Sequence, residues 1–325
     1  MKKIIALTLC VLLLLSPLSL VAFAKANAPI HDYYAKAGTY KVSTALYASG
    51  EVTYDHYKIW YPSAITASSK KFPLIVYCNA TGCTYSTIDV PEHLAHIASW
   101  GFVVIANDQL LTGNGASASK GLEFMVRLSK TKGSIFYKKI DTDKVGLNGH
   151  SQGGTATINA ASRNKFSNSS MFKAICAVSV PNSNLASSVA QNSPYDASKV
   201  TCPAFLIAGT GAMEAGICPL NSITSNFRKM SNSKNVMGRI TGQDHLGILD
   251  HTTAYTTAWF RYILCGDTYA ARAFQGSGAE ILSNSDWQDV YTKQTGSPAT
   301  SAQSSALVTI ITNVLRNILM RLVRR

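Results

Sequence analysis

The sequence predicts an α/β domain with a mostly parallel central sheet of about eight strands and helices on both faces. Two runs rich in β-branched and aromatic residues come first, at residues 40–47 and 52–61. After them, short apolar runs alternate with helical patterns, an order typical of βαβ units. Hydrophobic residues make up 46% of the chain and charged residues 14%. This composition supplies enough apolar side chains for a sheet that is buried on both faces.

The remaining strands and helices follow from the period of the apolar residues. Short apolar runs bounded by turn residues predict strands at residues 74–79, 102–106, 144–148, 174–180, 204–208 and 236–241. Helical spacing predicts helices between several of them, for example at residues 91–99, 117–129 and 155–162. Ligands of such sheets bind at the carboxyl ends of the strands, so the segments that follow the strands are the place to look for a functional site.

The N-terminal segment differs from this central domain. Two lysines precede an uncharged, apolar run over residues 4–24, which ends with the small residues Ala22 and Ala24. This pattern predicts a cleaved secretory signal peptide at residues 1–24, with an uncleaved N-terminal anchor as the alternative. We therefore expect a secreted protein, extracellular or periplasmic, whose main domain spans residues 25–294.

The C-terminal segment is basic. Residues 295–305 are small and polar and predict a linker, and residues 306–325 repeat apolar residues at helical spacing, with four arginines and no acidic residue. A basic amphipathic helix of this kind favours contact with an anionic membrane surface, and a terminal helix packed on the domain is the alternative. The net charge is +13, but the rest of the chain has no dense cluster of basic and aromatic residues. The sequence therefore does not favour nucleic-acid binding.

A nucleophile motif follows the fifth predicted strand. The residues Gly149-His150-Ser151-Gln152-Gly153 form a G-x-S-x-G pattern between a strand and a helix. In this setting the chain makes a strained turn, and small residues on both sides of the serine let the neighbouring segments pack closely. The motif predicts that Ser151 is a catalytic nucleophile, exposed at the N-terminus of a helix.

A serine nucleophile needs a histidine base, and in proteins with this strand–turn–helix motif the base follows the serine in the chain. Only His245 and His251 do so. His245 lies in a glycine-bounded loop after the last predicted strand, whereas His251 falls in the next helical pattern. We predict that His245 is the base and keep His251 as the alternative.

Glu214 is the best candidate for the acid that orients the base. It is the only carboxylate residue in the stretch 209–243, which follows the strand at 204–208. In this fold the acid stands between the serine and the histidine in chain order. The alternatives are Asp244, Asp250 and Asp108.

Two backbone amides are expected to bind the oxyanion that develops in the transition state. One is the amide of Gln152, directly after the nucleophile, and the other is expected at Gly82 or Cys83, after the third strand. No metal or organic cofactor is implied, because His93 and His96 are too few ligands for a metal site. The pairing of the cysteines in an oxidising compartment stays open among Cys78, Cys83, Cys176, Cys202, Cys218 and Cys265.

The segments at residues 38–41, 99–104, 149–154 and 259–262 resemble the α/β-hydrolase superfamily. Within it they are similar to the dienelactone-hydrolase-like, chlorophyllase-like and cutinase-like polyester hydrolases. The resemblance covers nearly all of residues 36–274 and implies an α/β-hydrolase fold. It matches Ser151 to the nucleophile, His245 to the base, and the amides of Cys83 and Gln152 to the oxyanion hole. The segment 182–199 is too short for a multi-helix cap, and an open cleft favours bulky or polymeric substrates.

Two positions depart from the family's pattern. The family's usual aspartate aligns best with Ala212, so Glu214 would be a shifted replacement or the triad would be weakened. The polyester-degrading members tend to carry an aromatic residue after the sixth strand, where this chain reads Pro181-Asn182-Ser183. This departure argues against aromatic polyesters as substrates.

These observations predict a secreted serine hydrolase that cleaves carboxylic esters through an acyl-enzyme on Ser151, in the manner of lipases, esterases and cutinases. The substrate would be an ester, lipid or polymeric in form. One alternative is an amidase, thioesterase or acyltransferase with the same triad. The other is a catalytically weak binding module at a membrane surface. The sequence does not predict an oligomeric state.

The first prediction concerns export. Protein recovered outside the cytoplasm should begin at or within a few residues of Lys25, because signal peptidase reads the small residues at Ala22 and Ala24. Mass spectrometry of the intact protein measures this N-terminus. Recovery of a chain that still begins at Met1 in the membrane fraction would instead establish an anchor.

Overall fold

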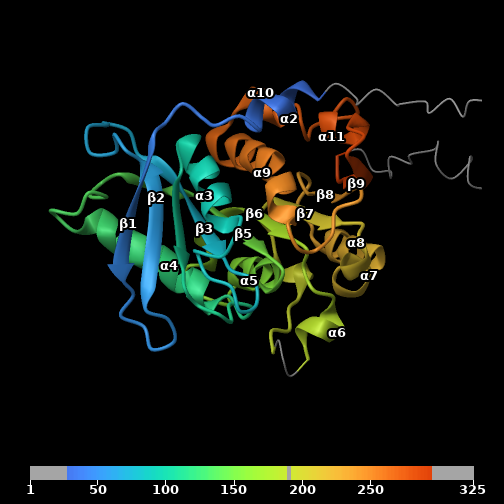
Figure 1. Cartoon of the computed structure of the whole chain (residues 1–325), viewed down its shortest axis with the longest axis horizontal. Helices are drawn as coiled ribbons and strands as arrows, with labels where there is room; N and C mark the ends of the chain where they lie inside the picture. Colours follow the sequence, from blue (N-terminus) through green and yellow to red (C-terminus); the bar gives the residue numbers. More distant parts are fainter. Residues whose placement is uncertain (1–27, 189–191, 295–325) are drawn as a thin grey trace, which may run out of the picture.

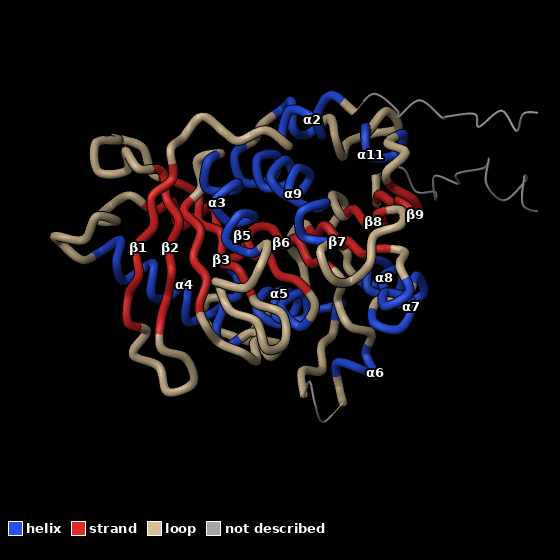
Figure 2. The backbone as a smooth tube through the Cα atoms, in the orientation of Figure 1, coloured by secondary structure: helices blue, strands red, loops and turns tan. Residues whose placement is uncertain are grey.

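A sheet of nine strands runs through the protein, in the order β1-β2-β4-β3-β5-β6-β7-β8-β9. The computed structural model describes residues 28–188 and 192–294. Strands β3 to β8 are mutually parallel, whereas β1, β2 and β9 are antiparallel additions at the two edges. Figure 1 and Figure 2 show the resulting twisted sheet with helices on both sides. The described residues therefore form an α/β-hydrolase type of sheet.

The central strands are buried because their sequences are almost continuously apolar. Every residue of β4 and β7 is buried, as expected for parallel strands covered on both faces. The strands are β1 (Val42–Ala48), β2 (His56–Pro62), β3 (Phe72–Cys78), β4 (Val103–Asn107), β5 (Ile140–His150), β6 (Phe172–Val178), β7 (Ala204–Gly209), β8 (Val236–Ile240) and β9 (Trp287–Thr292).

The helices cover the sheet in two layers. Helices α2, α3, α9 and α10 pack together on one face, and α4, α5 and α8 lie on the other (Figure 1). The helices are α2 (Pro29–Tyr34), α3 (Val90–Ser99), α4 (Ala116–Lys130), α5 (Gln152–Ala161), α6 (Ser183–Ala186), α7 (Ala212–Ile217), α8 (Leu220–Lys229), α9 (Ile248–Cys265), α10 (Thr268–Ala271) and α11 (Glu280–Ser283).

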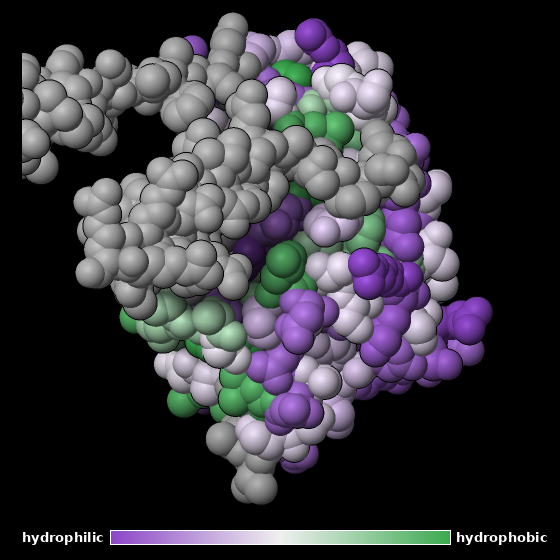
Figure 3. All heavy atoms as spheres, turned by 90° about the vertical axis from the view of Figure 1, so that its right-hand side faces the viewer, coloured by the Kyte–Doolittle hydropathy of each residue, from purple (hydrophilic) through white to green (hydrophobic). Residues whose placement is uncertain are grey.

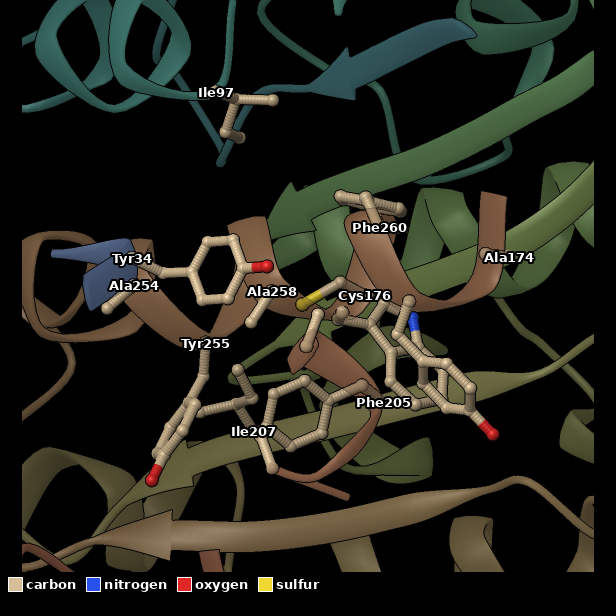
Figure 4. Packing of buried hydrophobic residues seen from close by; sticks show 14 of the residues in the cluster. Tyr34, Ile97, Ala174, Cys176, Phe205, Ile207, Ala254, Tyr255, Ala258 and Phe260 are labelled. Atoms are coloured by element: carbon tan, nitrogen blue, oxygen red, sulfur yellow. The ribbon is translucent and has the colours of Figure 1, made fainter. Parts of the chain in front are cut away.

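Helix α9 is the centre of one hydrophobic core. It carries an almost fully buried series of residues across the sheet, and its Trp259 is 0% exposed. Figure 4 shows Ala258 of this helix beside Cys176 of β6, and Ala254 beside Tyr34 of α2. The small side chains let the helix approach the strands closely. The indole Nε1 of Trp259 donates a hydrogen bond to the carbonyl oxygen of Ile175 at 3.0 Å, so its one polar group is satisfied.

The predicted α/β architecture and the eight strands are confirmed, with differences at the strand ends. The second strand begins at His56 instead of residue 52, because residues 49–55 form the turn that connects it to β1. Strand β9 was not predicted. Its alternation is broken at Asp289, which has a φ of 51°, and such an irregularity hides a short edge strand from a period-two pattern. Within its described part, the segment 182–199 holds only α6 and a short 3₁₀ turn, so it builds no multi-helix cap.

Several predictions fall outside or at the margin of the described residues. The signal peptide at 1–24, the linker at 295–305 and the basic helix at 306–325 all lie outside them, so export and membrane contact stay predictions from the sequence. Among the described helices, none combines the length and apolar character needed to span a bilayer.

The six described cysteines are all free thiols. Figure 3 shows hydrophilic and apolar residues interspersed on the side of the molecule that faces right in Figure 1.

The second prediction concerns the core under α9. Replacing Trp259 with alanine removes a fully buried ring and its hydrogen bond to the Ile175 carbonyl. The substitution should lower the free energy of unfolding by about 3–5 kcal/mol. Urea denaturation measures this loss. Leu46→Ala in β1 is the control, because Leu46 is 57% exposed, and it should change stability by less than about 0.5 kcal/mol. Equal effects of the two substitutions would contradict this description of the core.

Candidate active site

Ser151 lies in the turn between β5 and α5. Its backbone has a φ of 57° and a ψ of −122°, a strained conformation for a residue with a side chain. The amide of Ser151 donates to the carbonyl of Val178 at 2.9 Å, and its carbonyl accepts from the amide of Thr155 in α5. These bonds hold the strained turn between two strands and a helix. The turn presents the Ser151 hydroxyl at the N-terminus of α5.

The glycines of the motif are required by close packing. A Cβ atom on Gly153 would lie 1.9 Å from the carbonyl oxygen of Cys78, and one on Gly149 would lie 2.4 Å from the carbonyl oxygen of Gly153. Both distances are far below van der Waals contact, and both neighbours are backbone atoms. The first turn of α5 therefore packs directly against the ends of β3 and β5, which no larger residue allows.

His245 brings its imidazole to the serine from the loop after β8. Its Nε2 lies 3.0 Å from Oγ of Ser151, and its Nδ1 lies 3.1 Å from Oε1 of Glu214. Ser151 is 7% exposed and His245 is 6% exposed, so the hydrogen-bonded chain is almost completely removed from bulk water. The three residues predicted as nucleophile, base and acid thus lie in one continuous chain of hydrogen bonds.

Glu214 reaches the imidazole from the first turn of α7 instead of the end of β7. Its side chain is buried, and Oε1 also accepts a hydrogen bond from the hydroxyl of Ser179. Ser179 follows β6 and has a φ of 51°. The sequence analysis missed Ser179, and its one signal is its place at the carboxyl end of a predicted strand. The acid next to His245 is thus a glutamate from a helix, and its side chain is longer than that of the family's usual aspartate.

His150 also supports the base, and the sequence analysis treated it only as the variable position of the motif. Its ring packs against the ring of His245, with centroids 4.7 Å apart and an angle of 40° between the planes. Burial lowers the pKa of His150 to about 3, with the neighbouring His245 as a lesser cause. His150 is therefore neutral at pH 7, and it provides a flat, uncharged surface against which the base can lie.

The residues predicted for the oxyanion hole have different surroundings. Gln152 is the first residue of α5, so its amide is at the positive end of that helix, and its side-chain Oε1 accepts from the amide of Thr112 at 3.0 Å. The amide of Gly82 donates to the carbonyl of Leu110 at 2.9 Å, and the amide of Cys83 donates to that of Ala80 at 3.1 Å. Either amide would have to exchange a bond to bind an oxyanion, and the Cys83 bond is the longer one.

The alternative acids have other partners. Asp108 accepts hydrogen bonds from the amides of Asp55 and His56 beside β2, and Asp244 accepts backbone amides of α7. Asp250 lies in the first turn of α9, together with the alternative base His251. Neither of these last two residues shares a hydrogen bond with Ser151 or His245 among the contacts of the described residues.

His93 and His96, which lie outside the triad, are hydrogen-bonded to other protein atoms. Nδ1 of His93 lies 2.7 Å from Oγ1 of Thr253, and its Nε2 lies 2.7 Å from Oδ1 of Asn148. Burial lowers the pKa of His93 to about 4, and Nε2 of His96 bonds to the carbonyl of Tyr34. His93 and His96 therefore have little freedom to bind a metal. In the described residues, one group of potential ligand atoms converges within 4.8 Å, at Asp55, His56 and Asp108 on the surface.

A cleft of about 550 Å³ lies between α3, α9 and the end of β8. It is lined mainly by polar residues, among them Glu92, His96, Gln243, Asp250 and His251. Neither Ser151 nor His245 lines it. The chemistry of the triad is therefore not located in this cleft.

A family model described as PET hydrolase-like matches residues 22–287, which include Ser151, Glu214 and His245. The chain belongs to this family. Membership confirms the resemblance to the α/β-hydrolase superfamily and its polyester hydrolase-like members, and it indicates a hydrolase that acts on esters. No curated protein matches the chain.

The third prediction concerns the packing of the turn between β5 and α5 that carries Ser151. Gly153→Ala forces its Cβ onto the Cys78 carbonyl and should displace the first turn of α5, and a shift of about 1 Å in a reacting group costs about 10²-fold in rate. The measurement is the rate at which a fluorophosphonate probe labels Ser151. Gly278→Ala is the control, because no atom lies within 4 Å of its added Cβ. Labelling of the Gly153 variant at the wild-type rate would show that the close approach is not required.

Proposed function

We propose that this member of the PET hydrolase-like family is a secreted serine hydrolase that cleaves carboxylic esters through an acyl-enzyme on Ser151. The observation that carries the proposal is the buried chain of hydrogen bonds from Glu214 through His245 to Ser151, with distances of 3.1 and 3.0 Å. A nucleophile, a base and an orienting acid at these distances suit acyl transfer. The family supports the ester bond as the target.

The first half of the reaction forms the acyl-enzyme. An ionised Glu214 only accepts hydrogen bonds, so Nδ1 of His245 carries the ring proton and Nε2 is free to accept the proton of the Ser151 hydroxyl. Ser151 Oγ attacks the acyl carbon while Nε2 takes this proton. The tetrahedral intermediate then collapses, the C–O bond to the alcohol breaks, and His245 returns the proton to the leaving oxygen.

The second half releases the acid. A water molecule gives a proton to Nε2 of His245 and attacks the acyl carbon, and the collapse of the second intermediate returns the proton to Ser151 Oγ. In both halves the imidazole is transiently positive. Glu214, which is buried beside it, stabilises this charge. The amide of Gln152, at the positive end of α5, is placed to stabilise the negative oxygen of each intermediate.

Exposed apolar side chains support an apolar substrate. Leu110 and Leu111 follow β4, Met213 lies next to Glu214, and Leu246, which is 75% exposed, lies next to His245. The three leucines belong to loops that follow the carboxyl ends of strands, and Met213 lies in α7, which follows β7. Large apolar side chains that gather on one side of a protein without being buried commonly mark a contact surface. We infer that the acyl chain or the surface of a water-insoluble ester contacts these loops.

The fourth prediction tests the proposed function. The purified protein should hydrolyse p-nitrophenyl esters of short acyl chains and should be labelled by a fluorophosphonate at Ser151. Ser151→Ala and His245→Ala should each lower kcat/KM by about 10³-fold or more, because the members of a triad act as a unit. Glu214→Ala should cost about 10²-fold, since the proton acceptor remains.

His251→Ala serves as the matched control and should leave kcat/KM near the wild-type value. Loss of activity in this variant with retention in His245→Ala would overturn the assignment of the base. Faster cleavage of p-nitroanilides than of the matching esters would favour an amidase. An inert wild-type protein that no fluorophosphonate labels would favour a binding module.

A further inference from the structure

Asp244 connects the loop that carries the acid to the loop that carries the base. Its Oδ1 accepts the amide of Met213 at 2.9 Å and the amide of Glu214 at 3.2 Å, both in the first turn of α7. The same oxygen accepts the amide of His245 at 2.8 Å. One carboxylate oxygen therefore accepts backbone amides of both the acid, Glu214, and the base, His245.

The position of α7 depends on this contact. The first amides of a helix have no partner within the helix, and the side chain of the preceding residue usually accepts one of them. Here that residue is Gly211, which has no side chain to do so, and Asp244 accepts the amides from another loop. Helix α7 has six residues, and a helix this short is not stable without tertiary contacts.

Further backbone contacts hold the two loops together. The amides of Thr210 and Gly211 donate to the carbonyl of Gln243 at 2.9 and 2.8 Å, and the amide of Gly242 donates to Oγ1 of Thr210 at 2.8 Å. A Cβ on Gly211 would lie 2.5 Å from the Cβ of Asp244. The loops after β7 and β8 are thus in direct contact, with Asp244 at the point where they meet.

The acid needs this support because few side chains hold its carboxylate. Oε1 of Glu214 bonds to Ser179 and His245, whereas the buried Oε2 has no hydrogen-bond partner among the described residues. A glutamate also has one more rotatable bond than an aspartate. The direction of the carboxylate therefore depends strongly on where the backbone of α7 places Glu214.

We propose that Asp244 is a positioning residue of the hydrolase, which holds the backbone of Glu214 so that its carboxylate reaches Nδ1 of His245. The inference rests on the proposed function. Asp244 does not touch the reacting atoms and acts through Glu214. An asparagine would serve at this position, because its Oδ1 accepts backbone amides about as well as a carboxylate does.

The fifth prediction compares Asp244→Ala with Asp244→Asn in p-nitrophenyl butyrate hydrolysis. The alanine variant should lose about 10- to 100-fold in kcat with KM changed less than about 2-fold, because a misplaced orienting acid affects the transition state more than substrate binding. The asparagine variant should keep kcat within about 3-fold of wild type. Asp244→Ser, whose shorter side chain does not reach α7, provides the same comparison should the alanine variant not fold.

Asp267→Ala is the control for stability. Oδ1 of Asp267 accepts the amides of Tyr269 and Ala270 in α10, and Oδ2 pairs with Arg261, so none of these contacts involves a triad residue. This variant should lower the melting temperature at least as much as Asp244→Ala and leave kcat unchanged. If kcat fell in both variants in proportion to the decrease in their melting temperatures, the proposal would be overturned.

A double-mutant cycle separates positioning from other roles. In a Glu214→Ala background, Asp244→Ala should change kcat by less than about 2-fold, because the residue through which it acts is already gone. The same fold-loss in both backgrounds, or equal loss in the asparagine and alanine variants, would overturn the inference while the proposed function stands. A wild-type protein without esterase activity or fluorophosphonate labelling would overturn both.

Discussion

The close approach of α5 to the ends of β3 and β5 is the constraint on which the candidate site depends. Because no Cβ fits at Gly149 or Gly153, the helix begins directly at the sheet, and Ser151 is held in a strained turn at its N-terminus. The Ser151 hydroxyl lies 3.0 Å from Nε2 of His245, which belongs to the loop after β8. The amide of Gln152 is placed at the positive end of the helix by the same packing.

Contacts between loops bring together the base, the acid and the serine that supports the acid. His245 follows β8, Glu214 belongs to the helix after β7, and Ser179 follows β6, so three neighbouring parallel strands each contribute one residue. The rigid sheet brings these loops together, and hydrogen bonds between them determine the final directions of the side chains. This division of roles allows the acid to come from a helix in this chain, although the resemblance implied an aspartate at Ala212.

The surroundings of the triad fit ester hydrolysis by a protein without a large cap. The base and the nucleophile are almost completely buried, which strengthens the hydrogen bonds between them. Next to Glu214 and His245 in the chain, Met213 and Leu246 are exposed, and the described part of the 182–199 segment adds only short helical turns. The triad side chains are therefore buried, whereas apolar side chains next to them in the chain are exposed.

The sequence by itself determined the α/β class, eight of the nine strands and the strand–turn–helix motif at Ser151, because these depend on local periodicity and on glycines at fixed spacing. It also ranked His245 and Glu214 first, from chain order together with their places in segments that follow predicted strands. Only the tertiary structure decided that Glu214 reaches His245, that Ser179, His150 and Asp244 support them, and that the amides of Gly82 and Cys83 already have partners. Those contacts join residues far apart in the chain, and no local pattern encodes them.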